Sequence, residues 1–280
     1  MIIVNMTGQL GNQMFQYAIY RKLALIGKNV KMDTSYYDVY PHHNSFYIFK
    51  LNIIKSTSKE SLKEKDQYRS YLDRIRRKFL GRRNNTISEI NNKVYYYNPN
   101  IFELKRGFID GYWQSEKYFS DIKNILLNDF RFPTITDLRN KELLKKITET
   151  NSVSIHVRRG DYADGFPLLS KNYYEQAIKY FTIQNNTPFF YVFSNDIPWA
   201  KENMIYENII FIDWNTGKES WKDMYLMTQC NHHIIANSSF SWWGAWLNQK
   251  ENKEVIAPSV WFHHQETPDV YCEGWKIINI

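Results

Sequence analysis

Residues 152–161 read Ser-Val-Ser-Ile-His-Val-Arg-Arg-Gly-Asp, a mainly apolar run that ends in two arginines, a glycine and an acid. The run predicts a buried strand, and the polar residues after it predict a loop at its carboxyl end. Further strands are predicted at 189–193, 209–213, 231–236 and 255–257, alternating with helices at 171–183, 198–204, 221–228 and 240–247. Repeated β–α units predict a parallel sheet with helices on both faces, which is an α/β fold.

The first half opens in a related way. A strand is predicted at 2–6, a glycine turn at 8–11, a helix that Gly27 ends, and a second strand at 29–33. This β-turn-α-β opening is typical of nucleotide-binding α/β domains. We therefore expect two such domains, with their boundary in the charged stretch 136–151.

Composition excludes several classes of protein. The 280 residues are 43% hydrophobic, with 11 Gly and 2 Cys, which excludes a disordered chain, a collagen and a disulfide scaffold. No signal peptide and no apolar run of ~18 residues that could cross a membrane is recognised. Cys230 and Cys272 lie outside any metal-ligand spacing, so we expect reduced thiols and a cytoplasmic protein.

The positive charge is concentrated in one segment. The whole chain has a formal charge of +7, and residues 55–93 alone hold 12 Lys plus Arg against 5 Asp plus Glu. Within it, apolar residues at helical spacing predict a basic amphipathic helix, inserted in the first domain. Its charges are either simply solvated or contact anionic lipid headgroups at the inner face of the membrane. No nucleic-acid-binding signature accompanies them, so nucleic acid is not expected as a partner.

Three predicted strand ends in the second half bear polar motifs. Arg158 and Arg159 follow the first strand, and guanidinium groups hold phosphate oxygens in bidentate geometry. Asp196 follows the next strand and is either a ligand contact or a helix cap. Ser238 and Ser239 begin a helix, and backbone N–H groups with hydroxyls at a helix start bind phosphate without a metal. Ligands of such sheets bind beyond the carboxyl ends of the strands.

Other site types fit less well. The turn at 7–13 lacks the G-x-G-x-x-G spacing of dinucleotide folds and the ending of a P-loop, although Asp33 resembles the ribose-binding acid of an NAD-dependent oxidoreductase. No metal is expected, because the histidines form adjacent pairs whose side chains would diverge. His42 and His43 lie in a polar loop and are candidate acceptor contacts.

Five stretches, in order, resemble a known family. The matching stretches are Gly-Gln-Leu-Gly-Asn-Gln-Met-Phe-Gln-Tyr-Ala at 8–18, Gly-Tyr-Trp-Gln-Ser-Glu-Lys-Tyr-Phe at 111–119, His-Val-Arg-Arg-Gly-Asp-Tyr at 156–162, Phe-Ser-Asn-Asp at 193–196 and Asn-Ser-Ser-Phe-Ser-Trp-Trp-Gly-Ala-Trp at 237–246. On these stretches the chain resembles the bacterial α-1,2-fucosyltransferases of glycosyltransferase family 11. Residues 44–51 depart from the family's usual Arg-Phe-Glu-Leu-like stretch, so the resemblance does not specify the acceptor.

The resemblance implies a fold and a reaction. The fold is GT-B-like, with two Rossmann-like domains whose parallel sheets face across a cleft: residues 1–150, mainly on the acceptor side, and residues 151–280, which bind GDP-L-fucose. The reaction is an inverting, metal-independent transfer of L-fucose to the 2-hydroxyl of a terminal galactose. The acceptor would be a glycan such as an O-antigen repeat, a capsule repeat or a free oligosaccharide.

Site residues follow from the motifs and the resemblance together. Related fucosyltransferases use the first arginine of the His-x-Arg-Arg motif on the donor pyrophosphate, a role that falls here on Arg158, and a shared turn near the donor points to Asn12. The expected donor contacts are Asn12, His156, Arg158, Arg159, Asp196, Ser238 and Ser239. Asp161 either orients an arginine or is the catalytic base, for which Asp110, Glu116 and His43 are alternatives.

The acceptor side is less defined by sequence. Trp113, at a predicted strand end, and His43 are the candidate acceptor contacts. Trp242 and Trp243 are expected in the core, because a tryptophan in a helix packed on a sheet is more often buried than ligand-binding. Two rival functions remain: another sugar-nucleotide transferase, and a non-catalytic protein that binds glycan or membrane.

Overall fold

The computed structural model describes residues 1–65, 75, 86–89, 96–160, 167–183, 187–262 and 266–280. The chain forms two compact units, Met1–Arg131 (unit 1) and Phe132–Ile280 (unit 2). Most of the basic segment 55–93, and Asp161, lie outside the described residues. None of the described helices is both long enough and apolar enough to span a membrane.

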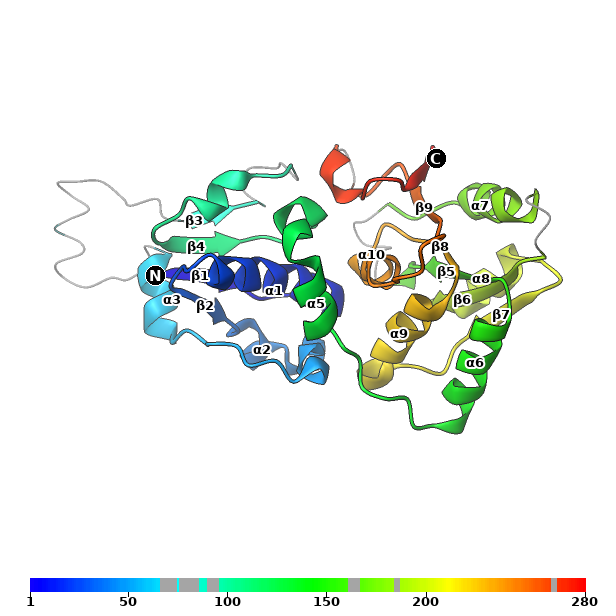
Figure 1. Cartoon of the computed structure of the whole chain (residues 1–280), viewed down its shortest axis with the longest axis horizontal. Helices are drawn as coiled ribbons and strands as arrows, with labels where there is room; N and C mark the ends of the chain where they lie inside the picture. The colour runs from blue at the N-terminus through cyan, green and yellow to red at the C-terminus, as the bar shows by residue number, and fades with distance from the viewer. Residues whose placement is uncertain (66–74, 76–85, 90–95, 161–166, 184–186, 263–265) are drawn as a thin grey trace. The chain divides into compact units, whose positions relative to one another are not determined.

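Unit 1 is built on a four-stranded parallel sheet. Its strands are β1 (Ile2–Asn5), β2 (Val30–Asp33), β3 (Thr86–Ser88) and β4 (Gly107–Asp110), in the order β2-β1-β4-β3. The long helix α1 (Leu10–Leu25) packs on β1 and β2, as Figure 1 shows. The remaining helical elements are α2 (Tyr36–Val39), η1 (Pro41–His43), η2 (Phe46–Phe49), α3 (Ser58–Glu64), η3 (Pro99–Phe102), η4 (Glu116–Tyr118), η5 (Ser120–Ile122) and α5 (Lys123–Asp129).

Unit 2 is built on a six-stranded parallel sheet. Its strands are β5 (Ser152–Val157), β6 (Phe189–Ser194), β7 (Ile209–Ile212), β8 (His232–Ile234), β9 (Val255–Pro258) and β10 (Lys276–Ile278), in the order β10-β9-β8-β5-β6-β7. Its helical elements are α6 (Leu138–Glu149), α7 (Lys171–Ile183), α8 (Ile197–Asn203), η7 (Gly217–Glu219), α9 (Trp221–Gln229), α10 (Ser239–Trp246) and η8 (Pro268–Val270). Two parallel sheets with covering helices confirm the predicted α/β class (Figure 1).

The central strand β5 shows why this sheet needs helices on both faces. All six of its residues are buried. Val153, Ile155 and Val157 pack in one core with side chains of α7 and α8. The alternate residues face the other way, where His156 meets Phe240 of α10. Successive side chains of a strand point to opposite faces, so the run is apolar on one face and polar on the other.

The boundary between the units differs from the prediction. The division falls between Arg131 and Phe132, not within 136–151 at the predicted border of residues 1–150 and 151–280. The charged stretch is helix α6, which packs on α9 of unit 2. Asn140 of α6 is buried and donates a hydrogen bond from Nδ2 to Oδ1 of Asn215 (2.8 Å). The charges of this stretch cover the outside of an amphipathic helix and do not mark a linker.

Candidate active site

The predicted polar motifs of unit 2 meet at one edge of its sheet. In the sheet order, β5 lies between β8 and β6, and all three strands are parallel. Their carboxyl ends therefore lie side by side. Arg158 follows β5, Asp196 follows β6, and Ser238 follows β8 after a short link. The ring of His156 lies 5.6 Å from that of Phe240, which brings the end of β5 against the first turn of α10.

Helix α10 begins at this edge with a serine cap. Ser238 is the N-cap residue, and its hydroxyl accepts a hydrogen bond from the backbone N–H of Phe240 at 3.4 Å. Ser238 is buried and Ser239 is partly exposed. The rest of the helix is firmly anchored, because Trp242 and Trp243 are fully buried, as expected for core tryptophans. The first N–H groups of a helix are positively polarised, so this helix start can bind an anion.

His156 is buried and electrically neutral. Only 5% of the residue is exposed, and burial, reinforced by the charge of Arg158, lowers the pKa of its imidazole to about 3. Among the described residues, Nδ1 of this ring has no hydrogen-bond partner. A buried polar atom without a partner costs ~1–3 kcal/mol, which a bound ligand or an ordered water would recover. His156 therefore supplies an available ring nitrogen beside Arg158 and α10.

The two adjacent arginines have different surroundings. The guanidinium of Arg159 lies over the ring of Trp199, 4.0 Å from its centroid, and Nη1 donates to the carbonyl oxygen of Leu169 at 3.2 Å. Its Nε is 3.8 Å from Oδ2 of Asp196. Arg159 therefore packs this loop on α8, and its contact with the pyrophosphate stays a prediction. Arg158 is partly exposed at the end of β5.

Asp196 also has a structural role. Its Oδ1 accepts a hydrogen bond from the backbone N–H of Trp199 at 3.2 Å, so it caps α8, while its other oxygen faces Arg159. Of the two roles that the sequence left open for Asp196, the structure shows the helix cap, and the guanine or ribose contact stays a prediction. The other predicted acid of this unit, Asp161, lies outside the described residues, and its catalytic role stays a prediction.

Asn12 is held in unit 1 by polar side chains. It lies in the first turn of α1, and its Oδ1 accepts a hydrogen bond from Nε2 of Gln114 at 2.9 Å. Gly8, in the preceding turn, has a left-handed φ of 75°, and a Cβ there would lie 2.8 Å from Nδ2 of Asn12. Gln16 donates to the carbonyl oxygen of Gly111 at 2.9 Å. Side chains of α1 thus fix the glycine turn and the loop after β4 to each other.

Trp113 is placed differently from the prediction. Only 2% of it is exposed, its φ of 57° is left-handed, and its ring packs edge-on against Tyr118 at 5.7 Å. β4 ends at Asp110, so Trp113 is not at a strand end but in the loop beyond it. A buried ring cannot stack on a sugar, so the predicted acceptor contact is wrong in this respect, and Trp113 is a core residue of unit 1.

Glu89 is a buried carboxyl of unit 1 that the sequence does not single out. It follows β3 and is 5% exposed, and its Oε2 accepts hydrogen bonds from the backbone N–H groups of Tyr112 (2.7 Å) and Trp113 (2.9 Å). Burial raises the pKa of its carboxyl to about 7. A Cβ on Gly111 would lie 2.6 Å from Cβ of Glu89, which explains the glycine. In the sequence, Glu89 is a single acid near the end of a basic segment, and nothing distinguishes it.

His43 lies at the surface of unit 1, close to the turn that precedes Asn12. Its Nδ1 is 2.8 Å from the hydroxyl of Tyr36, and its carbonyl oxygen accepts a hydrogen bond from Nε2 of Gln13 at 2.8 Å. The same Nε2 donates to the carbonyl oxygen of Gly8 at 3.0 Å. Gln13 thus joins the loop of His43 to the glycine turn. Helix α1 contains one predicted site residue, Asn12, and through Gln13 it holds the other, His43.

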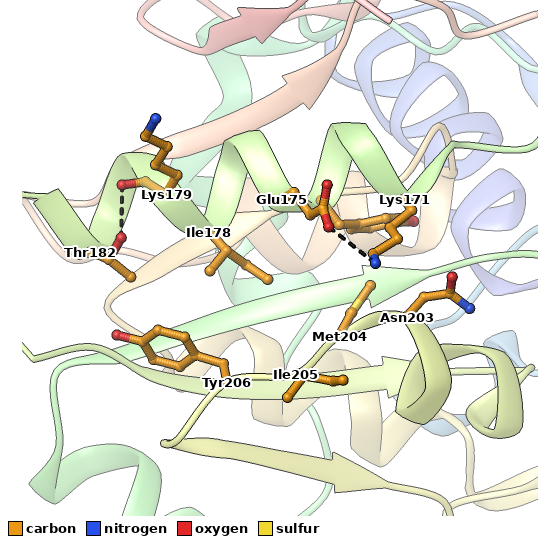
Figure 2. Close-up of a pocket in the computed structure, with 10 residues that line it drawn as sticks. Lys171, Glu175, Ile178, Lys179, Thr182, Asn203, Met204, Ile205 and Tyr206 are labelled. Atoms are coloured by element: carbon orange, nitrogen blue, oxygen red, sulfur yellow. Dashed lines mark hydrogen bonds and ion pairs between the residues drawn. The ribbon is translucent and has the colours of Figure 1, made fainter.

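A separate cavity of about 260 Å³ lies between α7 and the segment that follows α8, in unit 2. Figure 2 shows Ile178 facing Met204 and Ile205 across it, with Lys171 paired to Glu175 (3.3 Å) at its rim. None of the predicted site residues lines this cavity. Its charged groups are exposed and one lysine is already paired, so it does not form part of the candidate site.

No group of three or more His, Cys, Asp or Glu side chains suited to hold a metal ion occurs in the part of the chain that the structure describes. At the sheet edge of unit 2, the groups suited to bind phosphate are Arg158 and the start of α10. The residues present can hold an anion through a guanidinium group and backbone N–H groups.

Comparison with known proteins gives one family. The model of the family described as "Glycosyl transferase family 11" matches residues 1–279. An alpha-1,2-colitosyltransferase of Escherichia coli is 37% identical over 279 residues, covering 95% of this chain and 93% of that protein. The O-antigen biosynthesis glycosyltransferase WbnK of Escherichia coli is 31% identical over 300 residues, covering 96% and 98%.

A solved structure shares the fold. The fucosyltransferase NodZ from Bradyrhizobium matches with a TM-score of 0.50 at 11% identity, covering 87% of this chain and 90% of that chain. At this identity the likeness shows the fold alone, and it confirms the expected GT-B-like class.

Proposed function

The chain belongs to glycosyltransferase family 11, and from that membership we propose that it transfers L-fucose from GDP-L-fucose to the 2-hydroxyl of a terminal galactose, with inversion and without a metal. The glycan that bears the galactose is an O-antigen or capsule repeat or a free oligosaccharide. Membership supports a glycosyltransferase acting on a sugar nucleotide. The sugar and the linkage are the parts that the proposal adds.

One observation supports the proposal most directly. At a single edge of the unit 2 sheet, Arg158, the ring of His156 and the start of α10 come together, and Nδ1 of that ring has no hydrogen-bond partner within the described part of the chain. A nucleoside diphosphate offers matching groups, namely phosphate oxygens for the guanidinium and the helix N–H groups, and a polar ribose or base for the neutral ring nitrogen. We therefore propose that this edge binds the GDP part of the donor.

The proposed mechanism follows from the charge that develops during the reaction. When the bond between C1 of the sugar and the phosphate oxygen breaks, negative charge builds on the departing diphosphate. Arg158 and the N–H groups of α10 would stabilise that charge, and the N–H groups are fixed before the reaction because α10 is anchored by buried tryptophans. His156 remains neutral at physiological pH, so it would act as a hydrogen-bonding group and add no charge.

A second donor is favoured by a specific finding. The Escherichia coli relative that is 37% identical is named an alpha-1,2-colitosyltransferase. Colitose is the 3-deoxy analogue of fucose, so the two donors differ by one hydroxyl. A site that hydrogen-bonds that hydroxyl would reject the deoxy sugar by ~10⁴-fold or more, whereas a site that leaves it in an apolar pocket would discriminate weakly. The second candidate is therefore transfer of colitose in the same linkage.

The decisive experiment measures product. The protein is incubated with an acceptor, either methyl β-D-galactopyranoside or lactose, and with GDP-fucose or GDP-colitose as the donor. UDP-galactose serves as an unrelated donor. Each reaction contains EDTA and is run with and without added manganese. We expect GDP release and a new linkage at the galactose 2-hydroxyl, located by NMR, with EDTA present. Preference for GDP-colitose would select the second candidate. Binding of galactoside or of anionic vesicles without GDP release would instead support a non-catalytic protein, and a strict need for manganese would contradict the metal-independent mechanism.

A further inference from the structure

Three aromatic rings pack against one another at the surface of unit 1, and the ring of His43 is stacked on the other two. The rings of Tyr36 and Tyr40 are 4.8 Å apart, and the imidazole of His43 lies 5.6 Å from Tyr40 with only 14° between the ring planes. His43 is also stacked on Tyr36 at 5.8 Å. We call Tyr36, Tyr40 and His43 the aromatic platform. It is formed by α2 and η1, two very short elements that have little stability of their own.

The platform is partly open to solvent. Tyr40 is 44% exposed, and Tyr36 and His43 are partly exposed, whereas the neighbouring Tyr37 is 8% exposed and packs inward. An aromatic side chain stabilises a protein most when it is fully buried in the core. These rings are only partly buried, so they contribute less to stability than core rings of the same size. Amphipathic aromatic groups held at a surface in fixed positions are typical of ligand-binding surfaces.

Hydrogen bonds fix the platform in place. The hydroxyl of Tyr36 is 2.8 Å from Nδ1 of His43, and Gln13 of α1 donates to the carbonyl oxygen of His43. Tyr37 donates from its hydroxyl to the carbonyl oxygen of Gly8 at 3.2 Å. The platform is thus bound to the glycine turn that precedes Asn12, a residue expected near the donor. Its rings are ordered before any ligand arrives, which lowers the entropic cost of binding.

The platform is uncharged at neutral pH. Burial lowers the pKa of His43, and the adjacent His42 lowers it further, so the imidazole is neutral. Burial also raises the pKa of Tyr36, which keeps its hydroxyl protonated. An uncharged surface of stacked rings with polar edges is complementary to a neutral ligand that has an apolar face and polar edges. A phosphate group would find no cation among these three side chains.

We propose that Tyr36, Tyr40 and His43 bind a neutral pyranose ring of the acceptor glycan, with the C–H face of the sugar packed on the ring of Tyr40. A β-galactoside has this form, because several of its C–H groups lie on one face while its hydroxyls project from the edge and the opposite face. The inference rests on the proposed function, since it names the part of unit 1 that receives the sugar acceptor. It adds Tyr36 and Tyr40 to His43 as acceptor contacts and replaces Trp113 in that role.

The test separates acceptor binding from donor binding. For Tyr40→Ala we expect the KM for lactose to rise about three- to tenfold, the effect of losing one aromatic contact, while the KM for GDP-fucose changes less than twofold. Tyr40→Phe keeps the ring and should restore the acceptor KM. Tyr96→Ala is the matched control, because Tyr96 is a 41% exposed tyrosine of the same unit outside the platform. Each variant is checked for an unchanged melting temperature.

Acceptor binding can also be measured directly, without turnover. Saturation-transfer NMR with lactose should show contact between the protein and the galactose C–H protons, and this contact should weaken in Tyr40→Ala but not in Tyr96→Ala. If the wild type fucosylates lactose and Tyr40→Ala leaves both the acceptor KM and this contact unchanged, the platform is not the acceptor site although the proposed function stands. If the wild type neither binds nor modifies any β-galactoside, the proposed function and the inference both fail.

Discussion

The two units use the same architecture and place opposite chemistry at the carboxyl edges of their sheets. In unit 2 that edge has Arg158 and the positively polarised start of α10. In unit 1 it has Asp110, which accepts a hydrogen bond from Asn5 at 2.7 Å, and the buried Glu89. A parallel sheet thus fixes where a ligand binds, and the side chains after each strand fix which ligand. The edge of unit 2 suits an anionic diphosphate, and the edge of unit 1 does not.

The largest expected effect tests the cationic edge. Arg158→Ala should lower kcat by ~10²–10³, because it removes a preorganised charge from the departing diphosphate. Arg139→Ala, a change of an arginine in the same unit whose side chain is 61% exposed, should leave kcat within about twofold. Steady-state rates of GDP release measure both. Equal losses in the two variants would show that Arg158 has no special role.

The next effect concerns the neutral histidine of unit 2. Because the folded pKa of His156 is about 3, below its ordinary value of 6.5, the unfolded chain binds the extra proton first as the pH falls. The stability present above pH 6.5 should therefore decline on acidification, by on the order of 3 kcal/mol at about pH 4 from this group. In His156→Gln the decline between pH 7 and pH 4 should be smaller than in the wild type. Denaturant unfolding at the two pH values measures it, and identical declines would contradict the assignment.

Glu89 of unit 1 should give the opposite pH dependence. Burial raises its folded pKa to about 7 from 4.5, so the native state holds its proton over a range in which the unfolded chain has lost it. Stability contributed by this group is present below about pH 4.5 and is lost as the pH rises through about 7, on the order of 2–3 kcal/mol. Glu89→Gln keeps an acceptor oxygen for the two N–H groups and removes the titration.

Melting temperatures at pH 5 and pH 8 test this prediction. The difference between Glu89→Gln and the wild type should favour the variant more at pH 8 than at pH 5. Glu89→Ala is the comparison, because it leaves two buried N–H groups without an acceptor and should be destabilised at both pH values, by ~1–3 kcal/mol for each group. If Glu89→Gln gives the same offset at both pH values, the carboxyl does not titrate in this range.

The two units also differ in how much the sequence revealed. Helix α7 was predicted at 171–183 and is found there, and β6, α9 and α10 lie within one residue of their predicted bounds. These elements have long apolar patterns of clear period. In unit 1, residues 116–129 are divided among the short elements η4, η5 and α5, and the three-residue strand β3 was not predicted. Such short segments are stabilised by tertiary pairing, which no local pattern records.

Whether a site residue could be predicted also depended on whether a local sequence pattern places it. Arg158, His156 and Ser238 could be located because each follows or ends a recognisable strand, and the parallel order then brings them together. The role of Arg159 could not, because its partners Trp199 and Asp196 are nearly forty residues away in the sequence. The tyrosines of the platform could not be predicted from the sequence either. What distinguishes them is that their rings pack together and yet remain partly exposed to solvent, and only a structure shows this.

The smallest expected effect decides between two roles of Ser238. As a helix cap it accepts one long hydrogen bond of 3.4 Å, so Ser238→Ala should cost only ~0.5–1 kcal/mol of stability, at the low end for N-caps. If Ser238 also contacts the diphosphate, the KM for the donor should rise severalfold in addition. Ser238→Gly serves as the control, since glycine is a tolerable N-cap that supplies no hydroxyl.

A rise in donor KM in both variants, with little loss of stability in the glycine variant, would assign the hydroxyl to the ligand. A loss of stability in the alanine variant alone, with the donor KM unchanged in both, would leave Ser238 as a cap and place the anion on Arg158 and the backbone N–H groups.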